Sequence, residues 1–180
     1  MQSVILQMKL QATTTNDLIK HHIIMKRIIF IIIAFLFTMP IYAQNRIVVS
    51  KQKMTLTVYD ENDKVLLQTK ISCGKNFGNK TRRGDKKTPE GTFKINMIQE
   101  SSSWTWDFKD GRGKIKGAYG PYFLRLKTPI TTMIGIHGTC YPELIGTRTS
   151  SGCVRIHNDV MLKLVKLVKI GTPVTIEKDK

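Results

Sequence analysis

Alternating apolar and polar residues are the main pattern along this chain. In KMTLTVYD, residues 53–60, the apolar residues Leu56 and Val58 alternate with threonine and tyrosine, and this period of two predicts a strand with one buried face. The turn-forming sequence DEND, residues 60–63, separates that strand from KVLLQTKIS, residues 64–72. Since aspartate and asparagine favour tight turns, the two strands are predicted to form an antiparallel hairpin.

Several later segments carry the same strand signal, because they are short, apolar and rich in β-branched or aromatic residues. These predicted strands are Gly91–Ile98, Pro121–Lys127, Thr132–Gly138, Cys153–Ile156 and Pro173–Glu177. Only Asn158–Gly171 has clear helical periodicity, with Asn158 as the expected N-cap and Gly171 as the expected end. The pattern predicts a mostly β domain, a β-rich α+β fold with one principal C-terminal helix.

Two long segments between predicted strands, residues 74–90 and 100–120, are rich in glycine, lysine, serine and aspartate. Loops of this length usually serve a functional site or stay mobile. The first contains GKNFGNKTRRGDKK, which is basic but lacks the spacing of a nucleotide-binding P-loop. We interpret it as a solvated loop that contacts anionic polymer.

The N-terminal region has the layout of a secretory signal peptide. Met25-Lys26-Arg27 precedes an apolar run, Ile28–Met39, and the small residue Ala43 follows. The run is shorter than the roughly 20 residues of a membrane-spanning helix. We therefore expect a leader plus signal over residues 1–43, with the signal at 25–43 and cleavage after Ala43. An uncleaved membrane anchor and a true start at Met25 are the alternatives.

The charge of the chain favours anionic surroundings. The sequence has 29 basic and 13 acidic residues, and removal of residues 1–43 takes away four of the former and one of the latter. The remaining net charge of +13 attracts anionic polymers over a long range. Because export makes nucleic acid the poorest fit, we expect an anionic cell-wall polymer as partner and no nucleic acid. The simpler alternative is that the basic surface only confers solubility.

The three cysteines are Cys73, Cys140 and Cys153. In an oxidising compartment an odd number leaves at least one thiol unpaired. The sequence leaves open whether Cys73 and Cys140 form a disulfide. Cys140 lies in the loop sequence GTCYPELIG, without the glycine and arginine neighbours of Cys153, and is ranked as spare or bridged.

The residues of a nucleophilic site lie close together near the C-terminus. IGIHGT places His137 at the end of a predicted strand, and SSGCVRIHND places Cys153 sixteen residues later. An imidazole can accept the thiol proton or, as imidazolium, hold the thiolate in an ion pair. Gly152 lets the backbone approach a substrate, so its amide and that of Cys153 are expected to face a developing oxyanion. Arg155 shares a strand face with Cys153 and offers a carboxylate-binding fork.

A histidine and a cysteine at this spacing are by themselves a weak signal. The order and spacing of IGIHGT, SSGCVRIHNDV and GTPVTI, however, resemble the L,D-transpeptidase catalytic domain, often called the YkuD domain. Residues 47–75 resemble the opening hairpin of that family, and KKTPEGTFKI resembles its Thr-Pro-Glu-Gly-x-Phe turn and strand. The resemblance covers nearly all of Arg46–Glu177, so residues 44–180 are expected to form one catalytic domain with no second domain.

The resemblance implies a peptidoglycan L,D-transpeptidase with a β-sandwich or mixed-sheet fold. Cys153 would attack the carbonyl of the third residue of a tetrapeptide stem, and the acyl group would pass to an amine, giving a 3-3 cross-link or D-amino-acid exchange. His137 matches the general base, the carbonyl of Gly138 matches the group that orients its ring, and Arg155 matches an arginine that we assign to the substrate carboxylate or to the site's architecture.

Further expectations follow from the same resemblance. Peptidoglycan stem peptides are the expected partners, and the chain is expected to act as a monomer in the periplasm or cell envelope, in cell-wall biogenesis and cell shape. No metal and no organic cofactor is implied, because a thiol, a base and amide donors suffice for acyl transfer.

One position departs from the family pattern. Many members carry a histidine before the Gly-Cys pair, whereas this chain has Ser151. Serine can donate a hydrogen bond but cannot carry charge, so any role of that imidazole in tuning the thiol is in doubt. Ser151, Trp104 and Tyr122 are expected to bind substrate, although packing alone would also explain the two aromatic residues. By strand alternation His157 faces away from the cysteine.

Two other functions remain open from the sequence. Ser151 keeps open a non-catalytic wall-binding protein of the same fold. Water in place of the amine would make the chain an L,D-carboxypeptidase, and the sequence does not separate a stem amine, a D-amino acid, a protein amine and water as acceptors.

Overall fold

The computed structural model describes residues 22, 24–31, 44–109 and 111–179. Residues 24–31 are helical and belong to a unit distinct from the domain that follows. The expected cleavage point at Ala43 and residues 32–43 of the expected signal lie outside the described residues. No helix in the described part of the chain combines the length and the apolar character that crossing a bilayer requires.

The domain is built from twelve short strands, one 3₁₀ turn and one helix in the described residues. The strands are β1 (Arg46–Ser50), β2 (Thr55–Tyr59), β3 (Val65–Lys70), β4 (Cys73–Gly74), β5 (Gly91–Glu100), β6 (Thr105–Asp107), β7 (Lys114–Lys116), β8 (Tyr122–Leu126), β9 (Gly135–His137), β10 (Arg148–Ser150), β11 (Val154–Arg155) and β12 (Pro173–Ile176). The turn η1 covers Pro142–Leu144, and the helix α2 covers Asn158–Leu167.

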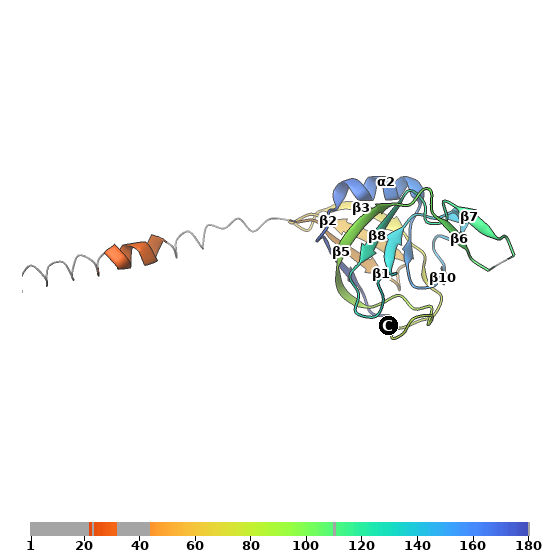
Figure 1. Ribbon diagram of the computed structural model, residues 1–180, viewed down its shortest axis with the longest axis horizontal. Helices are drawn as coiled ribbons and strands as arrows, with labels where there is room; N and C mark the ends of the chain where they lie inside the picture. Colours follow the sequence, from red (N-terminus) through yellow and green to blue (C-terminus); the bar gives the residue numbers. More distant parts are fainter. Residues whose placement is uncertain (1–21, 23, 32–43, 110, 180) are drawn as a thin grey trace, which may run out of the picture. The chain divides into compact units, whose positions relative to one another are not determined.

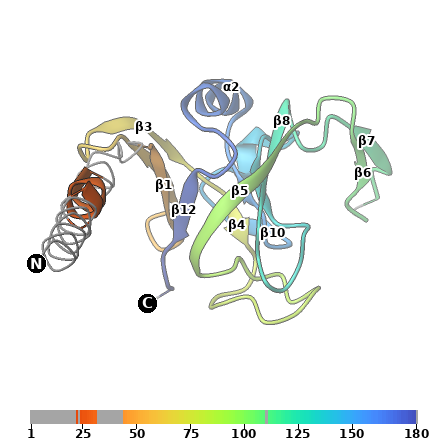
Figure 2. The same cartoon turned by 60° about the vertical axis from the view of Figure 1, so that its left-hand side comes forward.

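Eight of the strands form one mixed sheet in the order β11-β9-β8-β5-β12-β1-β2-β3. The pairs β1–β12 and β9–β11 are parallel, and the other neighbours are antiparallel. Figures 1 and 2 show that the sheet is strongly curled, with α2 lying beside it. This architecture confirms the predicted β-rich α+β class, the mixed sheet and the principal C-terminal helix.

The alternation that predicted the strands produces a single buried core. Ile47, Leu56, Val58 and Val174 are fully buried, and Met161 and Leu164 of α2 join them in one cluster. Burying a side chain of this size contributes roughly 1.5–3 kcal/mol. The core therefore fixes the register of β1, β2 and β12 and holds α2 against the sheet.

Helix α2 ends at Leu167, four residues before the predicted end at Gly171. Val168 is already extended, and Lys169 and Thr172 exchange hydrogen bonds that close a tight turn. The early end lets Val174 reach its partner positions on β1 and β5. The predicted helix was too long because the spacing of apolar residues does not show where the chain must leave the helix to enter the sheet.

The segment 100–120 is not wholly irregular, which corrects the prediction of a long loop. It contains the antiparallel pair β6–β7, with Trp106 opposite Ile115. Figures 1 and 2 show this hairpin projecting from the rest of the domain. Strands of three residues carry too little alternation to be predicted from the sequence.

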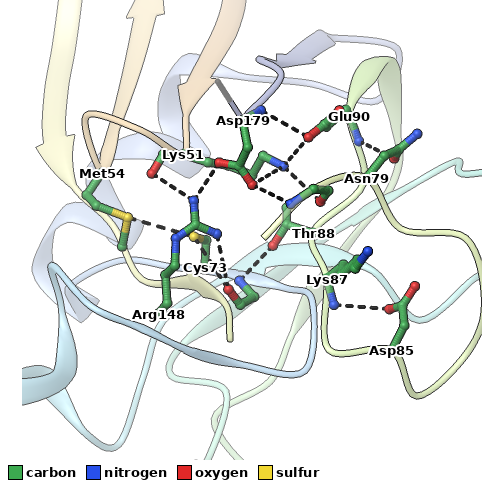
Figure 3. Close-up of polar contacts among 12 residues, drawn as sticks. Lys51, Met54, Cys73, Asn79, Asp85, Lys87, Thr88, Glu90, Arg148 and Asp179 are labelled. Atoms are coloured by element: carbon green, nitrogen blue, oxygen red, sulfur yellow. Dashed lines mark hydrogen bonds and ion pairs between the residues drawn. The ribbon is translucent and has the colours of Figure 1, made fainter. Parts of the chain in front are cut away.

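The segment 74–90 is irregular but strongly tied to the rest of the domain (Figure 3). The ammonium of Lys51, which is 1% exposed, donates to Glu90 at 2.6 Å and to the carbonyl of Gly78 at 3.1 Å. It also lies 3.0 Å from a carboxylate oxygen of Asp179, which accepts from the amide of Gly78 at 2.8 Å. The segment 74–90 is therefore tied to the domain by the charged groups of Lys51, Glu90 and Asp179.

Candidate active site

The strand register brings the two predicted catalytic side chains to one face of the sheet. Val154 pairs with Ile136, and Arg155 pairs with His137, on the parallel strands β11 and β9. Val154 and Ile136 are fully buried in the core, so their neighbours Cys153, Arg155 and His137 point to the opposite face. Cys153 and His137 are thus diagonal neighbours across two strands, and Arg155 shares their face as predicted.

This face forms the wall of a cavity of about 560 Å³, a size within the usual range for small-molecule sites. Its aromatic lining residues are Trp104, Trp106, Phe108, Tyr119 and Phe123. Its cationic lining residues are Lys80, Arg83, Lys86, Arg125 and Arg155. Within the described chain none of the lining residues is acidic, so the cavity suits an anionic ligand with apolar parts.

The ring of His137 is held on three sides. Its Nδ1 lies 2.6 Å from the carbonyl oxygen of Gly138, which makes Nδ1 the protonated nitrogen of the neutral ring and leaves Nε2 as the base. Phe123 stacks on the ring at 5.3 Å with an interplanar angle of 9°, and Tyr119 meets it edge-on at 4.9 Å. Gly138 thus has the position expected for the orienting carbonyl.

The absence of a side chain at Gly135 makes room for this stack. A Cβ at Gly135 would lie 2.3 Å from a ring carbon of Phe123 and 2.6 Å from the carbonyl of Leu124. Any larger residue at this position would push Phe123 out of its place against His137. Neither Gly135 nor Phe123 stands out in the sequence pattern.

Burial controls the charge of His137. Desolvation, followed by the nearby charge of Arg155, lowers the pKa of the imidazole to about 3, although hydrogen bonding to backbone groups of Gly138 and Tyr119 acts in the opposite direction. The imidazole is therefore neutral at physiological pH, as a general base must be.

Burial also keeps the thiol protonated. It raises the pKa of Cys153, and the smaller opposing effects are a backbone hydrogen bond from Gly135 and the charges of Arg155, Lys80 and Arg125. Consistent with a protonated thiol, Sγ lies in donating geometry 3.4 Å from the carbonyl of Met133. Of the two modes considered from the sequence, a neutral base that removes the thiol proton fits this site, and a standing thiolate–imidazolium pair does not.

The neutral imidazole predicts a loss of stability in acid. The unfolded chain takes up a proton on this side chain near its ordinary pKa of 6.5, whereas folded His137 does so only near 3, so folding stability falls as pH drops between these values. From pH 7.5 to pH 5 we expect a loss of about 2 kcal/mol from this group. Urea unfolding at both pH values measures it.

His137→Gln should abolish this part of the pH dependence even if it lowers stability at both pH values. His157→Gln is the matched control, because His157 lies outside the residues that line the cavity, and it should leave the dependence unchanged. An equal acid loss in the His137→Gln variant would show that another group causes it.

The amide of Gly152 does not point toward an oxyanion, as had been expected. Its amide donates to Oγ of Ser150 at 3.0 Å, and the same hydroxyl donates to the carbonyl of Cys153 at 2.6 Å. The amide is thus engaged in closing the turn, which contradicts its predicted orientation toward an oxyanion. Gly152 is needed instead for its backbone, since its φ of +135° is a conformation that side chains disfavour.

Arg155 is half-buried beside Cys153. Its guanidinium lies 5.4 Å from the ring centre of Phe108. Among the described residues, its Nε is one of two buried side-chain nitrogen or oxygen atoms without a hydrogen-bond partner. A buried donor without a partner costs free energy, so Arg155 is suited to bind an anionic group that enters the cavity.

Of the two aromatic residues expected to bind substrate, only one lines the cavity. Trp104 lines the cavity, as expected, and contacts Tyr119 and Phe123 at centroid distances of 5.8 and 5.7 Å. Tyr122 packs against the hydrophobic core and is not among the cavity-lining residues, so the structure does not bring it to the cavity where a substrate-binding residue was expected. The reason is strand alternation on β8: Phe123 faces His137, and Tyr122 faces the other way.

Tyr119 also lines the cavity, next to the ring of His137. Burial, together with the negative charge of an ionised Cys153, raises the pKa of the Tyr119 phenol to about 12. The hydroxyl of Tyr119 therefore remains protonated near Cys153. Ser151 also lines the cavity and is exposed, in agreement with its expected position.

Asn158 has a different structural role from the predicted one. The N-cap residue of α2 is His157, and Asn158 is the first helical residue. Its amide group instead accepts from the backbone N–H of Thr139 at 2.8 Å and donates to the carbonyl of Thr139 at 3.0 Å. Asn158 thereby fixes the backbone that follows His137.

All three cysteines are free thiols in this structure. Cys73 is fully buried, and burial raises its pKa. Cys140 is partly exposed and is not among the residues that line the cavity. Within the described residues no group of three or more histidine, cysteine or acidic side chains has the arrangement of a metal site.

Sequence comparison relates this chain to a known protein family. The family profile of the L,D-transpeptidase catalytic domain, YkuD, matches residues 44–176. The chain belongs to the L,D-transpeptidase catalytic-domain family. YkuD of Bacillus licheniformis is 34% identical over 131 residues, which are 73% of this chain and 64% of that protein. YqjB of Bacillus subtilis is 32% identical over 101 residues, which are 55% of this chain and 57% of that protein. This chain thus spans somewhat less than two thirds of these relatives.

Solved structures of L,D-transpeptidases share the fold. An L,D-transpeptidase from Mycobacterium smegmatis superposes with a TM-score of 0.57 at 19% identity, covering 75% of this chain and 59% of that one. L,D-transpeptidase 3 from Mycobacterium tuberculosis, in complex with a faropenem-derived adduct, gives 0.57 at 16% identity, covering 76% and 61%. The catalytic domain of the E. faecium L,D-transpeptidase gives 0.51 at 26% identity, covering 74% and 96%.

Proposed function

We propose that this L,D-transpeptidase family member is a cysteine acyltransferase that acts on the tetrapeptide stems of peptidoglycan. One observation carries the proposal. The neutral imidazole of His137, held by the carbonyl of Gly138 through Nδ1, lies on the same sheet face as the thiol of Cys153 at the wall of an apolar and cationic cavity. A nucleophile, a base and a binding site for an anionic peptide are the parts that acyl transfer needs.

In the proposed first step, Sγ of Cys153 attacks the carbonyl carbon of the third stem residue while Nε2 of His137 takes the thiol proton. A tetrahedral oxyanion forms. The carbon–nitrogen bond to the terminal D-amino acid then breaks, and the imidazolium returns its proton to the leaving amine. The product is a thioester on Cys153, and the imidazole is neutral again.

In the second step an amine attacks the thioester and His137 accepts its proton. The new amide leaves the enzyme, and the proton passes back to the released thiolate. An amine of a neighbouring stem gives a 3-3 cross-link, a free D-amino acid gives exchange, and water in the same position gives hydrolysis. Arg155, with its unpartnered Nε, is assigned to a carboxylate of the stem.

The test is to incubate the purified protein with a disaccharide tetrapeptide and to identify the products by mass spectrometry. We expect a stem shortened by one residue together with a cross-linked dimer. Faropenem, which forms an adduct with one structural neighbour, is a second probe. It should add its mass once, and peptide mapping should locate it on Cys153 and not on Cys140.

The outcomes separate the possible functions. A shortened stem without any cross-linked dimer, also when D-amino acids are added, would make the chain an L,D-carboxypeptidase. A protein that binds peptidoglycan but changes neither probe would refute the acyltransferase and support the non-catalytic alternative.

We also propose export to the periplasm or cell envelope, where peptidoglycan lies. The apolar run after Lys26 and Arg27 and the net charge of +16 of the whole chain support this location and contact with anionic wall polymer. Cell fractionation tests it, and an N-terminus at residue 44 on the exported protein would distinguish cleavage from anchoring. Enzyme found only in the cytoplasm would contradict the proposal.

A further inference from the structure

A buried lysine from a distant part of the chain lies beside the nucleophile. Lys80 belongs to the loop 74–90, yet its side chain is 3% exposed and lines the same cavity as Cys153. Its Nζ is only 3.5 Å from the point that a Cβ at Gly152 would occupy. The ammonium therefore lies next to the turn that carries the nucleophile.

The loop is packed onto that turn by its backbone. The carbonyl of Lys87 is 2.7 Å from the same Cβ position at Gly152, so the absence of a side chain there permits the contact. The amide of Lys75 donates to the carbonyl of Ser150 at 3.0 Å. These contacts fix the distance between the loop and the Ser-Ser-Gly-Cys turn.

The ammonium of Lys80 is held firmly by the loop itself. It donates to Oδ1 of Asp85 at 2.6 Å and to the carbonyl of Lys87 at 3.4 Å. Asp85 in turn accepts from the backbone amides of Thr81 and Arg82 at 2.8 and 3.1 Å. The carboxylate of Asp85 thus accepts hydrogen bonds from the loop backbone as well as from Lys80, and it fixes the position of the ammonium.

A cation at this place is useful because the turn supplies none. Ser151, which precedes Gly152 and Cys153, is uncharged and exposed. His137 is neutral before the reaction begins. Sγ must nevertheless become negative as it loses its proton, and Cys153 is half-buried, so an uncompensated charge there is costly.

We propose that Lys80 is a further residue of the active site, a cation that, alongside Arg155, stabilises negative charge on Sγ of Cys153 as the thiol is deprotonated. This inference deepens the proposed function, because it names a group that helps to make a half-buried, protonated thiol usable as a nucleophile. It does not depend on which acceptor completes the reaction.

The other charged and titratable groups near Sγ are few. Arg155 on β11 and Arg125 on β8 also favour the thiolate, together with Lys80. Arg125 is engaged by Gln99 at 2.9 Å and by the carbonyl of Thr132 at 2.6 Å. Tyr119 and His137 are the neutral titratable neighbours. Lys80 is thus the cation brought to the nucleophile by the loop 74–90.

The experiment measures the reactivity of the thiol with iodoacetamide, which needs no peptidoglycan substrate. Only the thiolate reacts, so the rate below the thiol pKa reports how much thiolate is present. For Lys80→Met we expect alkylation of Cys153 at pH 8 to be about tenfold slower, as for a thiol pKa about one unit higher. The difference should shrink as the pH rises and the thiol of both proteins ionises.

Two further variants exclude a merely structural effect. Asp85→Asn keeps the ammonium but removes its counter-charge, so it should make alkylation faster than in the wild type at pH 8. Damage to the loop would instead act in the same direction in both variants. Lys75→Met, an exposed lysine of the same loop, is the matched control and should react like the wild type.

The alkylation rates test the role of Lys80 independently of the proposed acyltransferase activity. Slower alkylation in Lys80→Met and faster alkylation in Asp85→Asn support the role of Lys80, whether or not the protein turns over stem peptides. An unchanged rate in Lys80→Met, or slower alkylation in both variants, overturns it. The acyltransferase proposal would stand in that case if wild-type protein still forms the cross-linked product.

Discussion

Replacing Cys153 with alanine is expected to abolish transfer from a tetrapeptide stem, and replacing His137 with glutamine is expected to slow it by roughly 10²- to 10⁴-fold. Alanine removes the atom that forms the thioester. Glutamine keeps much of the volume next to Phe123 but removes the base, and the thiol stays protonated because burial raises its pKa. The initial rate of stem shortening at pH 7.5 measures both effects.

The two variants should differ in their response to pH. The activity left in His137→Gln should increase with pH, because hydroxide can then ionise the thiol in place of the imidazole. Cys153→Ala should remain inactive at every pH. Cys140→Ala is the matched control and should retain full activity, since Cys140 is not among the cavity-lining residues. Substantial activity in Cys153→Ala would refute the proposed nucleophile.

The fold was largely predictable because its strands bury one face. Leu56 and Val58 alternate with polar residues, and both lie in the core. Every strand predicted from the pattern corresponds to a strand of the structure. Strand β1 lies partly in the family-like opening hairpin but was not predicted as a strand, and the three-residue strands β6 and β7 were missed because so few residues show no period.

The site was predictable only as far as it is local in the sequence. Alternation placed Cys153 and Arg155 on one strand face, whereas His137 comes beside them through the register of β9 and β11, which the sequence does not show. Phe123 was missed in favour of its neighbour Tyr122, because the side of a strand that faces a site depends on register. Lys80 could not be predicted as a site residue, since no periodic pattern links a loop residue to the turn at Gly152, 72 positions later.

The buried charges around Lys51 hold the loop that carries Lys80, and they are sensitive to the loss of any one partner. Burial raises the pKa values of Glu90 and Asp179, but hydrogen bonds, with Lys51 among the donors to both, outweigh it and keep both pKa values low. Arg148 adds a contact of 2.5 Å to the second carboxylate of this group, that of Asp179. Removing Lys51 would leave two mostly buried carboxylates with one cation between them.

Lys51→Met is therefore expected to lower the free energy of unfolding by about 3–5 kcal/mol, the usual cost of breaking a buried ion pair from one side. Methionine retains most of the apolar stem, so the loss reports the charge and its hydrogen bonds. Urea unfolding at pH 7.5 measures it. Lys53→Met, two residues away and exposed, should change stability by less than about 0.5 kcal/mol. A loss of similar size in both variants would contradict a stabilising role for this group of charges. A loss of less than about 1 kcal/mol in Lys51→Met would also contradict it, because that is the range of an exposed ion pair.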